Sequence, residues 1–401
     1  MTEEHMKLNP DFFESVEDQP LHLIFKVQKP DVPKVTSGSY LESPRMWNNL
    51  QRQNLNSIID LAMPKTVLHE LISAAEGQIA SDATDYCRSG FQLSCDALLE
   101  GLNISKLPLS RNFAIGVREK IAKYGACCVK NSNFSSAWEN DYIDSEHKET
   151  NFPGYDGTAI AKICYLILSS LIGTVDDNAR GALFDVQYKV PTSQEVNVLV
   201  SNTNDDSGWH TDGASFDRRY GIVGLQCIKP ASTEGGEFMI SHSGNALHDM
   251  KAKLPQFLLY ELERPVMHDV LENGRGLGKE SFSNGQMMGN SPRVIAQRIK
   301  MNSYPIYDHF DSSDGSFAFR YMRAWTTRAY ERAVMPMSPL LEIAMDCLDQ
   351  ALDHNTAFKR GLDTGEICYV NNLLVAHRRT AFGNDKERHM VIVRFGEECE
   401  E

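Results

Sequence analysis

The order of helix-like and strand-like segments constrains the fold of this chain most strongly. Apolar residues recur at helical spacing in the first half, and one such segment is opened by Pro64. From about residue 183, short runs rich in β-branched and aromatic residues alternate with turn residues. This order predicts an α+β fold with a mainly antiparallel β core, buttressed by the N-terminal helices. The expected helices lie near 46–62, 64–79, 110–124, 158–172 and 338–354, and the expected strands are Glu195–Ser201, Gly221–Ile228, Glu237–Ser241, Ser316–Tyr321, Glu366–Val370 and Arg388–Phe395.

The predicted domain organisation is an extended arm followed by one domain. Residues 1–45 contain several prolines and little periodicity, which indicates an arm laid over the surface. Residues 46–401 form the single domain, with its helical part over about 46–182 and its β core over about 183–401. No glycine-rich phosphate loop follows any expected strand, so a nucleotide-binding fold is not indicated.

The composition limits the kinds of molecule that we expect this protein to bind. The formal net charge of −14 argues against a nucleic-acid surface, which needs a basic face. The acidic, polar start has no secretory signal, and the most apolar stretch, Ile160–Ile172, is too short to cross a bilayer. Nine cysteines without a CxxC pair suit reduced thiols. We therefore expect a cytoplasmic protein with a small-molecule substrate and neither nucleic-acid nor membrane partners.

A His-x-Asp motif is the first sign of chemistry, because residues i and i+2 of a strand point the same way and can share a metal ion. Chance alone gives about one or two His-x-Asp/Glu matches in a chain of this composition. The three matches are His147-Lys-Glu149, His210-Thr-Asp212 and His309-Phe-Asp311. The outer two lie in turn-rich stretches, where ordinary surface residues are the simpler interpretation. Only His210 and Asp212 are bracketed by expected strands.

The C-terminal segment supplies the context that the motif lacks. It runs as turn, strand, polar corner and strand, and it places His377 near Arg388. With Gly208–Asp212 (GWHTD), the Gly235-Gly236 turn and the stretch Asn372–Phe382 (NLLVAHRRTAF), it resembles the TauD and clavaminate-synthase-like branch of the iron(II)/2-oxoglutarate-dependent oxygenases. The resemblance spans about residues 195–395, half of the chain.

The resemblance implies a fold and a cofactor set. The fold would be a distorted double-stranded β-helix, or jelly roll. His210, Asp212 and His377 would bind Fe(II), which would be used with O2 and the cosubstrate 2-oxoglutarate. Arg388 would pair with the distal carboxylate of 2-oxoglutarate, a role that suits a guanidinium fork. No catalytic residue is expected beyond the metal centre.

The sequence departs from the family pattern at the cosubstrate site. Relatives often place a threonine just after the Gly-Gly turn, to share the cosubstrate carboxylate with the arginine, and Phe238 takes that position here. Ser241 is the candidate that replaces its hydroxyl.

Candidate substrate contacts follow from position and charge. Ser201 ends the strand before the metal motif, and Arg394 lies beyond Arg388 on the same strand. Arginine hydroxylases of this branch hold a substrate guanidinium with acidic residues that follow a strand matching Phe319-Arg320-Tyr321. This chain has Met322, Arg323 and Ala324 there, so a free-arginine substrate is not expected. Arg320, Arg323 and Arg328 instead suggest a pocket for a carboxylate or another anion.

The resemblance implies hydroxylation of an unactivated C–H bond of a small amino acid or an amino-acid-derived metabolite. Asp212 disfavours halogenation, because related halogenases have Gly or Ala at that position. Desaturation, cyclisation or epimerisation in natural-product biosynthesis would use the same cofactors, and the sequence leaves them open. A non-catalytic β-helix protein that holds a metal with the same three residues is the alternative of another class.

Overall fold

The part of the chain that can be described in a computed structural model comprises residues 57–80, 102, 104–141, 156–176, 182–188, 203–213, 220–232, 234–270, 292–311, 316–383, 385 and 387–396. The arm predicted over 1–45 and the strand predicted at Glu195–Ser201 lie outside these residues.

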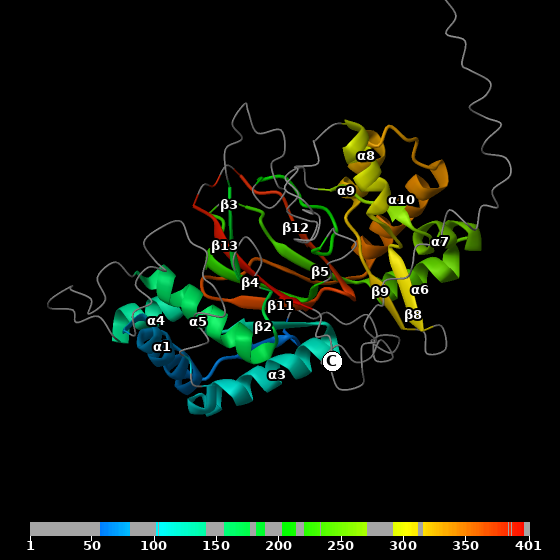
Figure 1. Cartoon of the computed structure of the whole chain (residues 1–401). Helices are drawn as coiled ribbons and strands as arrows, with labels where there is room; N and C mark the ends of the chain where they lie inside the picture. Colours follow the sequence, from blue (N-terminus) through cyan, green and yellow to red (C-terminus); the bar gives the residue numbers. More distant parts are fainter. Residues whose placement is uncertain are drawn as a thin grey trace, which may run out of the picture.

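A six-stranded sheet forms the centre of the molecule (Figure 1). Its strand order is β1-β2-β11-β4-β13-β3, and every neighbouring pair is antiparallel except β1 and β2. The strands are β1 (Asp60–Ala62), β2 (Ala126–Lys130), β3 (Leu183–Gln187), β4 (Tyr220–Lys229), β11 (Ile367–Asn371) and β13 (His389–Gly396).

A smaller, three-stranded antiparallel sheet has the order β10-β5-β12. Its members are β5 (Phe238–His242), β10 (Thr356–Arg360) and β12 (Val375–Arg379). Two short antiparallel ribbons complete the strands that the structure describes: β6 (Val266–Met267) with β7 (Ser303–Tyr304), and β8 (Tyr307–Asp311) with β9 (Ser316–Phe319).

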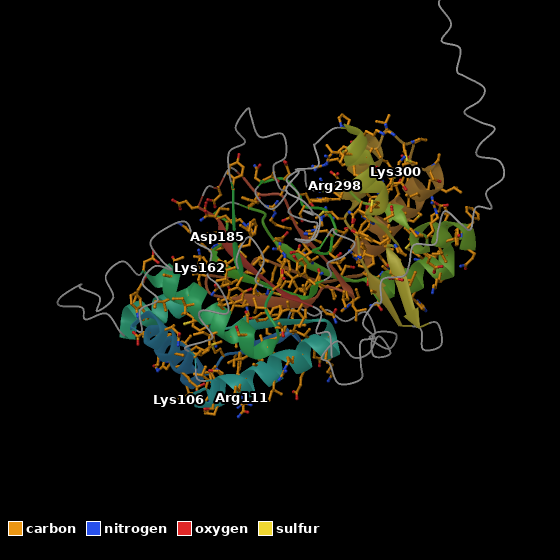
Figure 2. All side chains as sticks on the ribbon, viewed as in Figure 1. Lys106, Arg111, Lys162, Asp185, Arg298 and Lys300 are labelled. Atoms are coloured by element: carbon orange, nitrogen blue, oxygen red, sulfur yellow. The ribbon has the colours of Figure 1, made fainter. Side chains whose placement is uncertain are left out.

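Helices cover the two sheets from opposite sides (Figure 1). One layer, which lies on the six-stranded sheet, comprises α1 (Lys65–Ala80), η5 (Ile104–Lys106), α3 (Pro108–Tyr124), α4 (Phe134–Asp141) and α5 (Gly157–Ile172). The other lies beside the three-stranded sheet and comprises α6 (Ser243–Lys253), α7 (Gln256–Glu263), α8 (Pro292–Met301), α9 (Arg323–Arg332) and α10 (Pro339–His354). Figure 2 shows Lys162 of α5 near Asp185 of β3, where an ion pair of 2.7 Å joins helix and sheet.

Strand alternation decides which β13 side chains face the site. Val391, Val393 and Phe395 belong to the apolar cluster that the six-stranded sheet shares with the N-terminal helices. Because successive side chains of a strand point to opposite faces, Met390 and Arg394 face the other way. Met390 accordingly belongs to the cluster that joins the two sheets and α10. The interior between the sheets therefore receives Arg394.

The structure confirms the predicted mixture of helices and largely antiparallel sheet. The helices expected near 64–79, 110–124, 158–172 and 338–354 are α1, α3, α5 and α10. The expectation of a helix up to residue 62 is wrong for its last residues, because the backbone of Asp60–Ala62 pairs with β2. The helices α6 to α9 were not expected; they have 8–11 residues each, and helices this short depend on tertiary packing. No described helix is long and apolar enough to cross a membrane.

Candidate metal centre

Strand pairing brings His210 and His377 together from positions far apart in the sequence. The two residues form an antiparallel bridge, and each backbone N–H donates to the other's carbonyl oxygen at 2.9 Å. Residues directly opposite each other in an antiparallel pair direct their side chains to the same face. The ring centroids of the two histidines lie 4.4 Å apart. The bridge to β12 thus places the distal histidine beside the His-x-Asp motif.

The three predicted ligands form one cluster. One potential ligand atom from each of His210, Asp212 and His377 lies within 4.8 Å of the other two. The Nε2 atom of His377 is 3.8 Å from Oδ1 of Asp212. No other group of three such residues meets this criterion within the described ranges. Of the two alternative motifs, His147 and Glu149 lie outside those ranges, and His309 and Asp311 lie on β8.

His210 is held in a form that can bind a metal. Its Nδ1 lies 2.9 Å from the Gly208 carbonyl oxygen, to which an Nδ1–H donates, so Nε2 keeps its lone pair. Burial and the nearby His377 lower the pKa of His210 to about 4. The imidazole is therefore neutral near pH 7, as metal ligation requires.

Asp212 is held at its backbone and at its carboxylate. The Asn372 amide oxygen accepts a hydrogen bond from the Asp212 N–H, and the Asn372 amide nitrogen donates to the Asp212 carbonyl oxygen, both at 2.8 Å. Arg394 Nε donates to Oδ2 of Asp212, also at 2.8 Å. Although burial raises the pKa of the Asp212 carboxyl, Arg394 and the two histidines hold it well below its usual range. The ligand is therefore anionic at neutral pH.

This donor set fits ferrous iron. Two neutral imidazoles and one carboxylate on a single face of an ion are the ligands of non-heme Fe(II) oxygenases, and they leave the remaining positions open. The residues that would hold the ion are His210, Asp212 and His377. His377 lies on β12 and His210 pairs with it, while the Asn372 side chain holds the backbone of Asp212, so the three side chains are positioned before an ion binds.

Arg388 is a buried cation beside the Gly-Gly turn. The residue is 5% exposed, and its guanidinium lies 5.0 Å from the Phe382 ring centroid. Gly236, with φ of +69°, lies beside it: a Cβ there would be in ordinary van der Waals contact with Arg388 Nε, at 3.6 Å. Burial and Arg379 lower the pKa of Arg388 to about 10. Among the described residues no carboxylate pairs with this guanidinium, so the position suits an anionic ligand.

Comparisons with known proteins agree with this geometry. The sequence model of the family described as "Taurine catabolism dioxygenase TauD, TfdA family" matches residues 100–393. The chain belongs to this family. This match confirms the prediction that the chain is an oxygenase enzyme of the iron(II)/2-oxoglutarate-dependent class. Fe(II), 2-oxoglutarate and O2 are the cofactors of that class, and the His210–Asp212–His377 cluster agrees with them. No curated protein sequence matches the chain.

Solved structures share the fold at low sequence identity. An asparagine oxygenase, solved with Fe(II), 2S,3S-3-hydroxyasparagine and succinate, is 15% identical, with a TM-score of 0.55 over 84% of this chain and 93% of its own. The non-heme iron oxygenase OrfP, solved with Fe, succinate and (3R,4R)-dihydroxy-L-Arg, is 14% identical, with a TM-score of 0.53 over 84% of this chain and 94% of its own. At these identities the likeness shows the fold alone.

In this TauD-family chain, the two β5 residues that the sequence connected with the cosubstrate face opposite sides of the strand. Phe238, which replaces the usual threonine, lies on the His377 side of β5, with the two ring centroids 6.0 Å apart. Ser241 faces the opposite side, because it pairs with Ala376 rather than His377, and its hydroxyl donates to the Leu352 carbonyl of α10 at 2.7 Å. The expectation that Ser241 binds the cosubstrate is therefore corrected.

The arginines expected at the substrate divide into two groups, and Ser201 lies outside the described residues. Arg323 pairs with Asp346 and Asp349 of α10 at 2.5 and 2.8 Å, on the outer side of the small sheet. Arg394 pairs with Asp212. The expected substrate contact of Arg323 is corrected, because two carboxylates of α10 hold its guanidinium. That of Arg394 stays a prediction, since the structure shows its Nε bound to Asp212.

The position of Arg320 is consistent with its predicted role as a substrate contact, which stays a prediction. His210 pairs with Met322 as well as with His377, so Met322 and its i−2 neighbour Arg320 face the ligand side. Arg320 is buried, with its guanidinium 3.6 Å above the Tyr304 ring centroid, and that ring stacks on His268 at 3.8 Å. Arg328, which the sequence grouped with Arg320, is ion-paired with the buried Asp269.

Sequence reasoning missed two contacts that hold Asp212 in place. Asn372 binds its backbone, and Arg394 binds its carboxylate. Asn372 follows β11 in a turn, and an asparagine after a strand is too common to be distinctive. The sequence marked Arg394 only as an arginine beyond Arg388 on the same strand, and no pattern indicated its contact with Asp212.

Proposed function

We propose that this chain is an iron(II)/2-oxoglutarate-dependent dioxygenase that hydroxylates an unactivated C–H bond of a small amino acid or an amino-acid-derived metabolite. The observation that carries the proposal is the combination of the His210–Asp212–His377 cluster with a buried guanidinium, Arg388, that no described carboxylate neutralises. A metal site with a purely structural role has no need of such a cation. The two sheets would be the layers of a distorted double-stranded β-helix, within one oxygenase domain.

Bound iron with 2-oxoglutarate and O2 would supply the oxidising power, with conversion of the cosubstrate to succinate and CO2. The protein residues bind, orient and shield. His210, Asp212 and His377 would occupy one face of the ion. Arg388 would receive the distal carboxylate of the cosubstrate, at a desolvated position where a charge-assisted pair is strong.

The substrate would lie on the same face of the small sheet as the two histidines. Arg320 is on that face and would bind an anionic group of the substrate, such as an amino-acid carboxylate. This orientation would hold one C–H bond toward the metal, and that is the main contribution a protein makes to such chemistry. The asparagine oxygenase and OrfP were solved with hydroxylated amino acids, which supports a substrate of this size.

Succinate formation from 2-oxoglutarate tests the proposal. The purified protein with Fe(II) and ascorbate would be screened against a library of amino acids and their derivatives, with mass spectrometry of the products. We expect the substrate to stimulate succinate formation, and we expect the rate to fall more than about 100-fold in Asp212→Ala and in His377→Ala. That loss exceeds the effect of removing a residue that only supports a metal ligand.

Arg323→Gln is the matched control, because it removes an ion-paired arginine away from the site and should leave succinate formation unchanged. Equal turnover in wild type and both ligand variants would refute the site. A wild-type protein that binds metal without succinate formation would favour the non-catalytic alternative.

A further inference from the structure

The Asp212 carboxylate is engaged at one of its two oxygens. Oδ2 accepts a hydrogen bond of 2.8 Å from Arg394 Nε, whereas Oδ1 faces Nε2 of His377 at 3.8 Å. The oxygen on the histidine side is therefore the one available to a metal, and the other is occupied by the protein.

Arg394 is well placed to fix that oxygen. It lies within β13, opposite Val223 of β4, in the middle of the six-stranded sheet. Its guanidinium lies 5.5 Å from the Tyr220 ring centroid and 5.8 Å from that of Phe184, and its side chain is only 18% exposed. A side chain enclosed in this way has few alternative rotamers. The Oδ2 acceptor is thus held by a rigid donor.

The Asp212 backbone is held by Asn372, in the turn after β11. Asn372, which is 2% exposed, binds both the N–H and the carbonyl oxygen of Asp212, and its amide also donates to the Tyr220 carbonyl. With the main chain fixed by Asn372 and one oxygen fixed by Arg394, the carboxylate has little freedom to rotate.

We propose that Arg394 is a positioning residue that restricts Asp212 to binding the metal through one oxygen. Carboxylates otherwise bind metals through one oxygen or both. Binding through both would take a further coordination position, and a chelating cosubstrate needs two adjacent open positions. The inference rests on the proposed function only where it concerns 2-oxoglutarate, since the coordination mode itself is independent of turnover.

The test uses the full-length protein loaded with Co(II) without O2, and two substitutions of matched length. In Arg394→Gln, the amide nitrogen occupies the place of Arg394 Nε and can still donate to Oδ2. In Arg394→Met, a methyl group occupies that place and cannot. Both variants lack the positive charge, so the difference between them isolates the hydrogen bond.

Two readouts report coordination without catalysis. These are the visible absorption of bound Co(II) and the dissociation constant of oxalate, a small chelator that needs two adjacent metal positions. We expect Arg394→Met to change the spectrum and to weaken oxalate at least about tenfold relative to Arg394→Gln, which should resemble wild type. Arg323→Met controls for the loss of an ion-paired arginine elsewhere.

Similar behaviour of the Met and Gln variants, whether both intact or both impaired, would overturn the proposal. A crystal structure of the wild-type Co(II) protein needs no variant to fold, and a Co(II) ion bound by both Asp212 oxygens would also overturn it. Wild-type protein that binds Co(II) and oxalate but not 2-oxoglutarate would instead refute the proposed function and leave the role of Arg394 standing.

Discussion

Arginine is the residue type whose role changes most with its surroundings in this protein. Arg323 and Arg328 form ion pairs with aspartates other than Asp212, and Arg394 is paired with Asp212, one of the three candidate metal ligands. Arg388 and Arg320 are buried, and no aspartate or glutamate of the described residues forms an ion pair with Arg388. We therefore expect the same charge to have different roles, namely stability, the proposed positioning of Asp212 and the proposed binding of ligands, according to its neighbours.

Substituting each of the two buried arginines in turn tests whether Arg388 binds the cosubstrate and Arg320 binds the organic substrate. Arg388→Ala should raise the KM for 2-oxoglutarate about 30-fold or more, since losing one partner of a buried charge pair costs about 2 kcal/mol or more. The KM for the organic substrate should change little. Arg320→Met should have the opposite pattern in the same steady-state assay. Equal effects of both variants on both constants would contradict the separate roles, whereas unchanged anaerobic Co(II) binding would confirm that the metal cluster is intact.

At the scale of elements, the Gly235-Gly236 turn before β5 packs closely against the segment after β12. Gly235 has φ of +94°, and a Cβ there would lie 1.9 Å from the Ala381 carbonyl oxygen. Gly235 also pairs with Phe382, whose ring lies against Arg388. The close contact between the turn and the segment after β12 therefore depends on the absence of a side chain.

Gly235→Ala should lower the free energy of unfolding by roughly 1–3 kcal/mol, because the left-handed backbone and the close contact are both incompatible with alanine. Urea unfolding measures the change. Gly361→Ala is the matched control, since a Cβ there meets no atom within 4 Å, and it should be neutral or slightly stabilising. Equal stability of the two variants would show that the contact at Gly235 is not maintained in solution.

Elements were predictable where the pattern was local and strong. The helix expected near 110–124 is α3, which begins at Pro108 and ends where Gly125 takes the left-handed conformation. Strands β4, β5, β11 and β13 followed from short β-rich runs. The short strand β1 and the helices α6 to α9 depend on tertiary neighbours that no local pattern reports.

At the scale of the whole molecule, buried histidines couple stability to pH. Burial lowers the pKa of His242 to about 4, and burial with the charge of Arg320 lowers that of His268 to about 3. Each folded-state pKa lies below the unfolded value of about 6.5, so the folded state binds fewer protons. Their contribution to stability is complete above about pH 6.5 and is lost as the pH falls toward the folded-state values.

We expect the metal-free protein to lose about 1–2 kcal/mol of unfolding free energy for each of these histidines between pH 7 and pH 5. Urea unfolding at several pH values measures the slope. His242→Phe and His268→Phe should each reduce the slope, whereas substitution of the exposed His354 with Gln should not. A pH dependence unchanged in both buried variants would show that other groups control acid stability.

The sequence by itself determined the class of fold, the family and the three metal-binding candidates. These rest on patterns within single segments, namely helical spacing, short β-rich runs, the His210–Asp212 motif and the histidine–arginine spacing after β11. Only the tertiary structure decided that Ser241 faces α10, that Arg323 pairs with aspartates of α10, and that Arg394 binds Asp212. The physical reason is that the face and partner of a side chain are set by strand register and packing between distant segments, which no local pattern records.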